Sequence, residues 1–154
     1  MDWANIIIAV VAVYGAVIST YTFILQRKKD RPNLKVKVKW GLIPLTNGDV
    51  SGPQLFIEAL NRGHTNITLS GQGFILPNNK TIVVPIPKSN VRFPHELEAG
   101  KGCSIWMDVI ETAHDLKANG YSGKIDLIGF YRDQVDITYK SKPYSFNIDE
   151  WCNK

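Results

Sequence analysis

Residues 34–40, LKVKVKW, alternate apolar and basic side chains without a break. A period of two residues is typical of a β-strand with one buried and one exposed face. The apolar face would consist of Leu34, Val36, Val38 and Trp40. The opposite face would carry Lys35, Lys37 and Lys39. This stretch therefore predicts a half-buried strand at the start of a β domain.

Further apolar runs bounded by turn residues follow along the chain. They cover residues 53–61, 67–76, 81–86, 103–109, 124–131, 135–141 and 144–148. About seven or eight short strands with turns at this rhythm predict an antiparallel β-sandwich. One helix is expected within it, because Asp108 is suited to cap a helix, Glu111 follows three residues later, and Asn119-Gly120 would end it. The Gly71-x-Gly73 pair lies inside a strand run and predicts a β-bulge.

Two segments carry a resemblance to a known type of domain. Residues 60–76, LNRGHTNITLSGQGFIL, and residues 93–102, FPHELEAGKG, resemble immunoglobulin-like sandwich domains of small membrane-anchored proteins in bacteria and phages. The shared features are a strand ending in Asn-x-Gly, a Thr-flanked entry into the next strand, and Leu-x-x-Gly before a later strand. The resemblance spans residues 53–109 and implies a fold without an activity. The Cys…Trp…Cys spacing of antibody domains is missing from the sequence.

The segment before the β domain is long, apolar and uncharged. Residues 3–25, WANIIIAVVAVYGAVISTYTFIL, would reach about 35 Å as a helix, enough to cross a hydrocarbon core of about 30 Å. The alternative is a cleaved signal peptide, which requires basic residues before the apolar core. Here the basic residues follow it. A transmembrane helix is therefore predicted.

The charges flanking this segment predict its orientation. Asp2 is the one charged side chain before it, whereas Arg27, Lys28, Lys29 and Arg31 follow it. The positive-inside rule then places the N-terminus outside and residues 26–154 in the cytoplasm, with the chain in the inner membrane. The first 40 residues hold seven Lys or Arg and two Asp, although the whole chain has a net charge of only +4.

This concentration of positive charge predicts contact with anionic lipid headgroups. The predicted contact residues are Arg27, Lys28, Lys29, Arg31, Lys35, Lys37 and Lys39. Two other roles stay open: the first four as determinants of topology alone, and the three lysines of residues 34–40 as protection of a sheet edge against unwanted pairing. Nucleic acid is not expected as a partner, since the cluster would lie against the bilayer.

Small residues within the apolar segment recur at helical spacing. Ala12, Gly15, Ala16 and Ser19 would share one helix face and form two small-xxx-small pairs. Such a face lets two helix backbones approach closely. It predicts self-association or pairing with another membrane protein.

Residues suited to catalysis or metal binding are not arranged in a recognisable pattern. His64, His95 and His114 lack paired metal-ligand spacing, and the Glu111-x-x-His114 pair would need ligands from further helices. Cys103 is expected in the core and Cys152 exposed near the C-terminal tail, both reduced in the cytoplasm. We expect no metal, no cofactor and no enzymatic activity.

Aromatic residues gather in the last 24 residues of the chain, beside three basic side chains. Tyr, Trp and Arg are enriched at binding hot spots, although aromatic residues also fill sandwich cores. The candidate partner-binding set is Tyr131, Arg132, Tyr139, Tyr144 and Trp151.

The sequence divides into an anchor at 1–26, a basic linker at 27–33, a sandwich at 34–150 and a tail at 151–154. We expect a membrane-anchored interaction or assembly module that binds a partner protein or itself, in a bacterial antiviral or envelope system. Two alternatives are a structural protein of a membrane-containing phage, and a ligand-sensing effector that oligomerises in the membrane.

Overall fold

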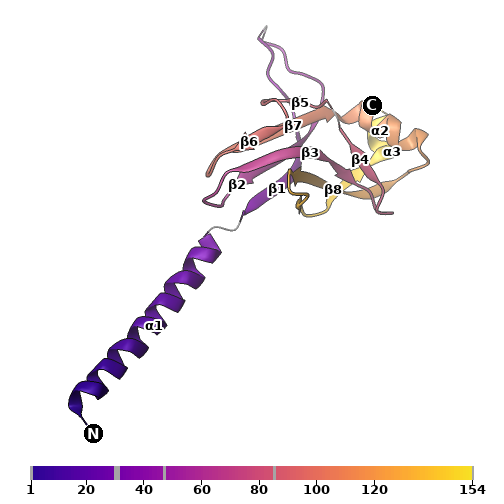
Figure 1. Ribbon diagram of the computed structural model, residues 1–154. Helices are drawn as coiled ribbons and strands as arrows, with labels where there is room; N and C mark the ends of the chain where they lie inside the picture. Colours follow the sequence, from indigo (N-terminus) through magenta and orange to yellow (C-terminus); the bar gives the residue numbers. More distant parts are fainter. Residues whose placement is uncertain (1, 30–31, 47, 85, 154) are drawn as a thin grey trace.

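The computed structural model describes residues 2–29, 32–46, 48–84 and 86–153, with the side chains of Lys28 and Lys29 left undescribed. The helices are α1 (Trp3–Lys29), α2 (Val109–Ala118) and α3 (Ile148–Cys152). The strands are β1 (Leu34–Gly41), β2 (Gln54–Asn61), β3 (Ile67–Ile75), β4 (Thr81–Val83), β5 (Lys88–Ser89), β6 (His95–Leu97), β7 (Gly102–Asp108), β8 (Lys124–Asp133), β9 (Thr138–Lys140) and β10 (Tyr144–Asn147). Figure 1 shows α1 projecting from one end of a β domain.

The first sheet has the antiparallel order β1-β2-β7-β5. The predicted alternation in β1 is confirmed from Leu34 to Lys37, because Leu34 and Val36 are buried while Lys35 and Lys37 are exposed, as is Lys39 further along. The prediction was wrong for Trp40, which is 53% exposed. β1 is an edge strand of this sheet. The three lysines therefore lie on the outer face of a sheet edge, which is consistent with the edge-protecting role.

The second sheet has the order β10-β8-β3-β4, with β6 also paired to β3 and β9 to β8. β8 is its longest strand, and it pairs with β10 through its first half and with β9 through its second half. The register between β3 and β8 shifts between Leu69 and Gly71. This irregularity lies directly before the Gly71-x-Gly73 pair for which a bulge was predicted, and the register is regular across the pair itself.

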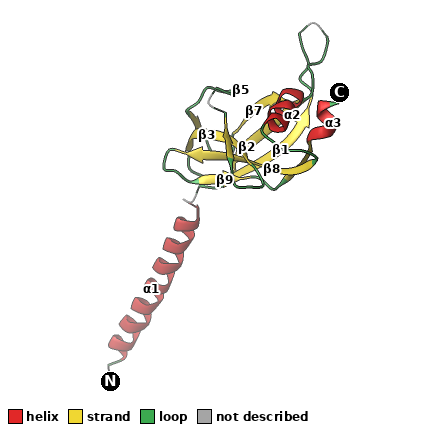
Figure 2. Cartoon of the chain, turned by 90° about the vertical axis from the view of Figure 1, so that its right-hand side faces the viewer, coloured by secondary structure: helices red, strands yellow, loops and turns green. Residues whose placement is uncertain are grey.

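The two sheets pack face to face and enclose the core (Figure 2). They approach each other closely at Gly129, where a Cβ atom would lie 2.5 Å from Cγ2 of Val38 and 2.9 Å from Cγ2 of Ile57. The Tyr131 hydroxyl crosses between the sheets and donates a 2.9 Å hydrogen bond to the carbonyl oxygen of Ile57. The fold is a mainly antiparallel β domain with an N-terminal apolar helix, as predicted.

The turn after β2 is held by one buried amide. Asn61 is fully buried, and its Nδ2 donates to the carbonyl oxygens of Thr65 at 2.8 Å and Leu97 at 3.0 Å. Its Oδ1 accepts from the Gly63 N–H at 3.0 Å. The Asn-x-Gly motif seen in the sequence therefore folds this turn and ties it to β6.

Two short helices lie side by side at the end of the domain opposite α1 (Figure 1). The predicted cap of α2 is confirmed, because Asp108 Oδ1 accepts from the backbone N–H groups of Ile110 and Glu111 at 2.9 and 3.1 Å. α3 is joined to α2 by an ion pair of 3.3 Å between Lys117 and Asp149.

Several elements differ from the segments expected from the sequence. α1 continues to Lys29, three residues past the predicted end of the anchor at residue 26. Strands β5 and β6 were missed because each is only two or three residues long. The sequence predicted a strand that ends at residue 148 and a tail that begins at 151. The structure has α3 here, with Ile148 buried and Trp151 packed against the core.

Candidate functional site

α1 is the helix that is long and apolar enough to span a membrane among the residues that the structure describes. The span covers Trp3–Arg27, and no residue in its most apolar stretch is buried against the rest of the described chain. The hydroxyls of Thr20 and Thr22 donate to backbone carbonyls one turn earlier, at 2.8 and 2.9 Å. Their polar groups are thus satisfied within the helix, as a lipid environment requires.

The small residues of α1 leave an open face on this helix. Ala12, Gly15, Ala16 and Ser19 are all exposed, and a Cβ atom added at Gly15 would meet nothing within 4 Å. The predicted packing face is therefore free of contacts within the described chain. A second helix could approach the backbone of α1 closely at this face.

The basic collar at the end of α1 consists of Arg27, Lys28, Lys29 and Arg31, and the structure describes only part of it. The guanidinium of Arg27 lies 4.9 Å from the centre of the Phe23 ring, a cation–π contact. Lys28 and Lys29 belong to α1, but their side chains lie outside the described residues, as does the whole of Arg31. The predicted headgroup contacts of these three residues stay predictions.

The three exposed lysines of β1 differ in their electrostatic surroundings: Lys39 has a carboxylate partner, whereas Lys35 and Lys37 are placed apart from it. Nζ of Lys39 lies 2.7 Å from Oε1 of Glu58 on the neighbouring strand β2. Lys35 and Lys37 lie further toward the α1 end of the same strand. No carboxylate within the described ranges forms an ion pair with these two lysines.

Beside these two lysines lies a shallow cavity on the outer face of the first sheet. Its volume is about 330 Å³, and Lys35, Lys37, Leu60, Arg62, Gly102 and Ser104 are among its lining residues. Two lysines from β1 and Arg62, the residue directly after β2, thus line one depression. Arg62 lies outside the basic runs identified in the sequence. It reaches the cavity because β1 pairs with β2.

The aromatic residues near the C-terminus do not form one exposed surface. Tyr131 was predicted to bind a partner, but its side chain is 0% exposed. Its ring fills the space between the sheets and stacks against Phe93 at 6.1 Å between ring centres. The burial of this side chain raises the pKa of its hydroxyl. Tyr131 is therefore a core residue, and its assignment to a binding surface was wrong.

The three other aromatic residues of the predicted binding set are half-buried. Tyr139, Tyr144 and Trp151 all pack at the margin of the core. Trp151 in α3 contacts Trp40 in β1 edge to face, with 6.0 Å between ring centres. This pair closes the end of the sandwich where α2 and α3 lie.

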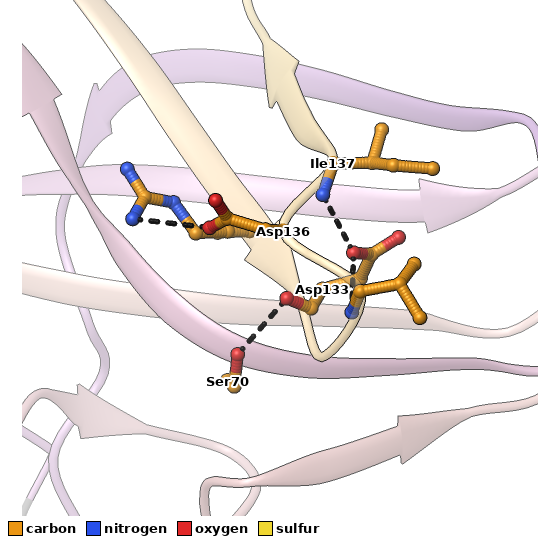
Figure 3. A network of polar contacts seen from close by, with 6 residues as sticks. Ser70, Asp133, Asp136 and Ile137 are labelled. Carbon is orange, nitrogen blue, oxygen red and sulfur yellow. Dashed lines mark hydrogen bonds and ion pairs between the residues drawn. The ribbon is translucent and has the colours of Figure 1, made fainter.

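The turn between β8 and β9 holds a polar network that includes Ser70, Asp133 and Asp136 (Figure 3). Arg132, the last predicted binding residue, lies at its edge. Its guanidinium pairs with Asp136 at 3.4 Å. Beside it, the carboxylate of the buried Asp133 accepts from the N–H groups of Val135 and Ile137 at 3.0 and 2.8 Å. The Ser70 hydroxyl in β3 donates to the Asp133 carbonyl oxygen at 3.2 Å.

The Asp133 carboxylate also accepts a 3.2 Å hydrogen bond from the Tyr139 hydroxyl. Burial and this neighbouring carboxylate raise the pKa of Tyr139 to about 12. These contacts hold the turn between β8 and β9 in shape, and the ion pair with Asp136 holds Arg132 beside it. We therefore interpret the network as one that stabilises the fold of this turn.

A second and larger cavity lies between α2 and β4. Its volume is about 480 Å³, within the range of small-molecule sites. The side chains of Leu76, Ile82, Val84, Met107, Leu116 and Tyr121 supply apolar lining. Glu111, Asp115 and Lys80 line it as charged groups.

Metal ligands are not assembled around Glu111 and His114. Within the described residues, no group of three or more His, Cys, Asp or Glu side chains could hold a metal ion. Cys103 is buried, and burial raises the pKa of its thiol to about 11, so the thiol is protonated at neutral pH. Cys152 is half-buried against the core and less exposed than predicted. Both cysteines are free.

Comparisons with known proteins do not assign the chain to a family. No family model matches the sequence, and no curated protein matches it either. One solved structure, described as "X-ray structure of Northeast Structural Genomics Consortium target SoR45", shares 15% sequence identity at a TM-score of 0.41. The likeness covers 74% of this chain and 85% of that one.

Proposed function

We propose that the protein is a single-pass membrane protein that works as a non-enzymatic assembly module, with its β domain on the cytoplasmic side. The observation that carries this proposal is the exposure of α1. Its apolar side chains cover a length sufficient to cross a bilayer, while the β domain encloses its own core without them. A soluble helix of this composition would have to bury one face against the domain.

The orientation rests on the flanking charges. Asp2 precedes the span, and the basic collar follows it. This asymmetry favours a cytoplasmic β domain by the positive-inside rule.

Self-association would occur through the small-residue face of α1. Without a hydrophobic force between helices in lipid, close backbone packing must supply the attraction, and small side chains permit it. Ala12, Gly15, Ala16 and Ser19 provide such a strip on a helix with no described neighbour. Two copies would then hold two β domains side by side beneath the membrane.

Replacement of Gly15 by leucine should disrupt this assembly. The larger side chain would separate the two backbones, and we expect the association constant in lipid to fall by about tenfold, or about 1.4 kcal/mol. Cross-linking of the full-length chain in native membranes measures the dimer fraction. Val10→Leu, on the opposite face of α1, is the matched control and should leave the dimer intact. A wild-type chain that stays monomeric would contradict the assembly role.

The cavity between α2 and β4 favours a second candidate function. An apolar depression of about 480 Å³ with charged groups among its lining could hold a small amphipathic molecule. The protein would then be a sensor whose assembly in the membrane depends on that ligand. The test is cross-linking of the protein in membranes with and without a small-molecule extract of the source cells. Oligomers that form only with the extract would favour the sensor, whereas oligomers that form without it would favour the assembly module.

A further inference from the structure

We infer that the cavity lined by Lys35, Lys37 and Arg62 binds the phosphate of an anionic lipid headgroup and so docks the β domain on the membrane surface. This inference rests on the proposed membrane anchor, and it assigns a ligand and a binding mode to the outer face of the first sheet. The argument combines the position of the cavity, its charge and its shape.

The cavity lies at the end of the sheet where the chain leaves α1. The Arg62 N–H donates a 2.7 Å hydrogen bond to the carbonyl oxygen of Asn33, directly before β1. Asn33 is four residues after Lys29, the last residue of α1, so the connection can reach about 14 Å at most. If α1 crosses the bilayer, the cavity must therefore lie close to the headgroup layer.

The charge of the cavity suits a phosphate. Lys35 and Lys37 point to the same face of β1, and Arg62 extends from the end of β2 on that face. Glu58 also lines the cavity, but its carboxylate is paired with Lys39 at 2.7 Å. Within the described residues, the three remaining cations have no ion-pair partner.

The shape of the cavity also suits a headgroup. Gly102 lies opposite Leu60 in the register of β2 and β7, and the lack of a side chain there leaves the depression open. A guanidinium can bind phosphate through two parallel hydrogen bonds, while lysines contribute point charges and Ser104 a hydroxyl. The volume of about 330 Å³ admits a phosphate with part of its headgroup.

The neighbouring side chains favour a lipid surface as the source of that phosphate. Leu60 is 43% exposed beside the cations, and Phe56 and Trp106 form a half-buried aromatic pair on the same sheet face, with 6.0 Å between ring centres. A face that combines cations with Leu, Phe and Trp matches the boundary between headgroups and acyl chains. Each basic side chain near an anionic surface contributes about 1 kcal/mol.

The test uses the full-length chain in lipid nanodiscs of phosphatidylcholine, with or without phosphatidylglycerol. Hydrogen exchange of residues 34–41, 58–62 and 102–106 reports docking of this face. We expect these segments to be protected in the anionic discs alone, and the protection to disappear at about 1 M salt, where the Debye length is about 3 Å. A combined Lys35→Gln, Lys37→Gln and Arg62→Gln variant should abolish the protection, with about a fivefold loss in the docked population for each cation removed.

Lys124→Gln is the matched control, because it removes the same charge from an exposed position on β8 of the second sheet, outside the lining of the cavity, and leaves the pair of Lys39 and Glu58 intact. It should keep most of the protection. Equal exchange in both kinds of disc would overturn the inference, as would an equal loss in the control. Protection by soluble glycerol phosphate in phosphatidylcholine discs would overturn the lipid as the source. A chain that is not retained in discs of either kind would contradict the anchor itself, which is a different failure.

Discussion

Gly129→Ala should destabilise the β domain by about 2 kcal/mol, although alanine is better suited than glycine to a strand interior. The added Cβ would lie 2.5 Å from Val38 Cγ2 and 2.9 Å from Ile57 Cγ2, well inside contact distance. Both neighbours are short branched side chains in the region where the sheets meet, so neither can swing away. Urea unfolding of the full-length chain in mild detergent, followed by tryptophan fluorescence, measures the loss.

Gly71→Ala is the matched control for this prediction. Its added Cβ would lie 3.5 Å from Cβ of Arg132, an ordinary contact, so we expect no loss of stability. Shortening Val38 to alanine in the Gly129→Ala background should restore part of the stability, because the two sites share one contact. Equal effects of alanine at positions 71 and 129 would show that the sheets do not approach each other at Gly129.

Val13→Asp combined with Val17→Asp should prevent stable insertion of α1 into the membrane. A charged side chain near the centre of a membrane helix costs about 2.5–3.5 kcal/mol on insertion scales, so the pair costs about 6 kcal/mol. Both valines are exposed on α1, and the core of the β domain does not include them. We therefore expect a folded domain that appears in the soluble fraction after an alkaline wash of membranes.

Two carboxylates at the ends of the helix provide the control for that experiment. Asn5→Asp with Gln26→Asp adds the same charge near the headgroups, where the cost of a charge is small. This variant should stay in the membrane fraction. Release of both variants to the same extent would mean that net charge, and not burial in lipid, decides where the chain is found.

The sequence predicted features that depend on local patterns. The alternation in β1, the Asp108 cap of α2 and the bulge near Gly71 each follow from residues close together in the chain. The apolar length of α1 is visible in the same way. These features need no knowledge of which strands pair.

Features that depend on strand pairing could not be predicted. Arg62 joins Lys35 and Lys37 only because β1 and β2 pair with Leu34 opposite Asn61. Tyr131 resembled an exposed binding residue in the sequence, and its burial follows from the second sheet packing on Ile57. The separation of Lys39 from the other two lysines likewise depends on Glu58, which lies across the strand pair.

Membrane topology is the most direct test of the central claim that α1 spans the bilayer with the β domain inside the cell. Cysteines introduced at Asp2 and Ala118, both exposed, can be labelled with a membrane-impermeant maleimide in a Cys152→Ser background, where Cys103 is buried. We predict that position 2 is labelled in intact cells and position 118 only after the cells are opened. Labelling of both positions only in opened cells, or recovery of the full-length chain in the soluble fraction, would contradict the account.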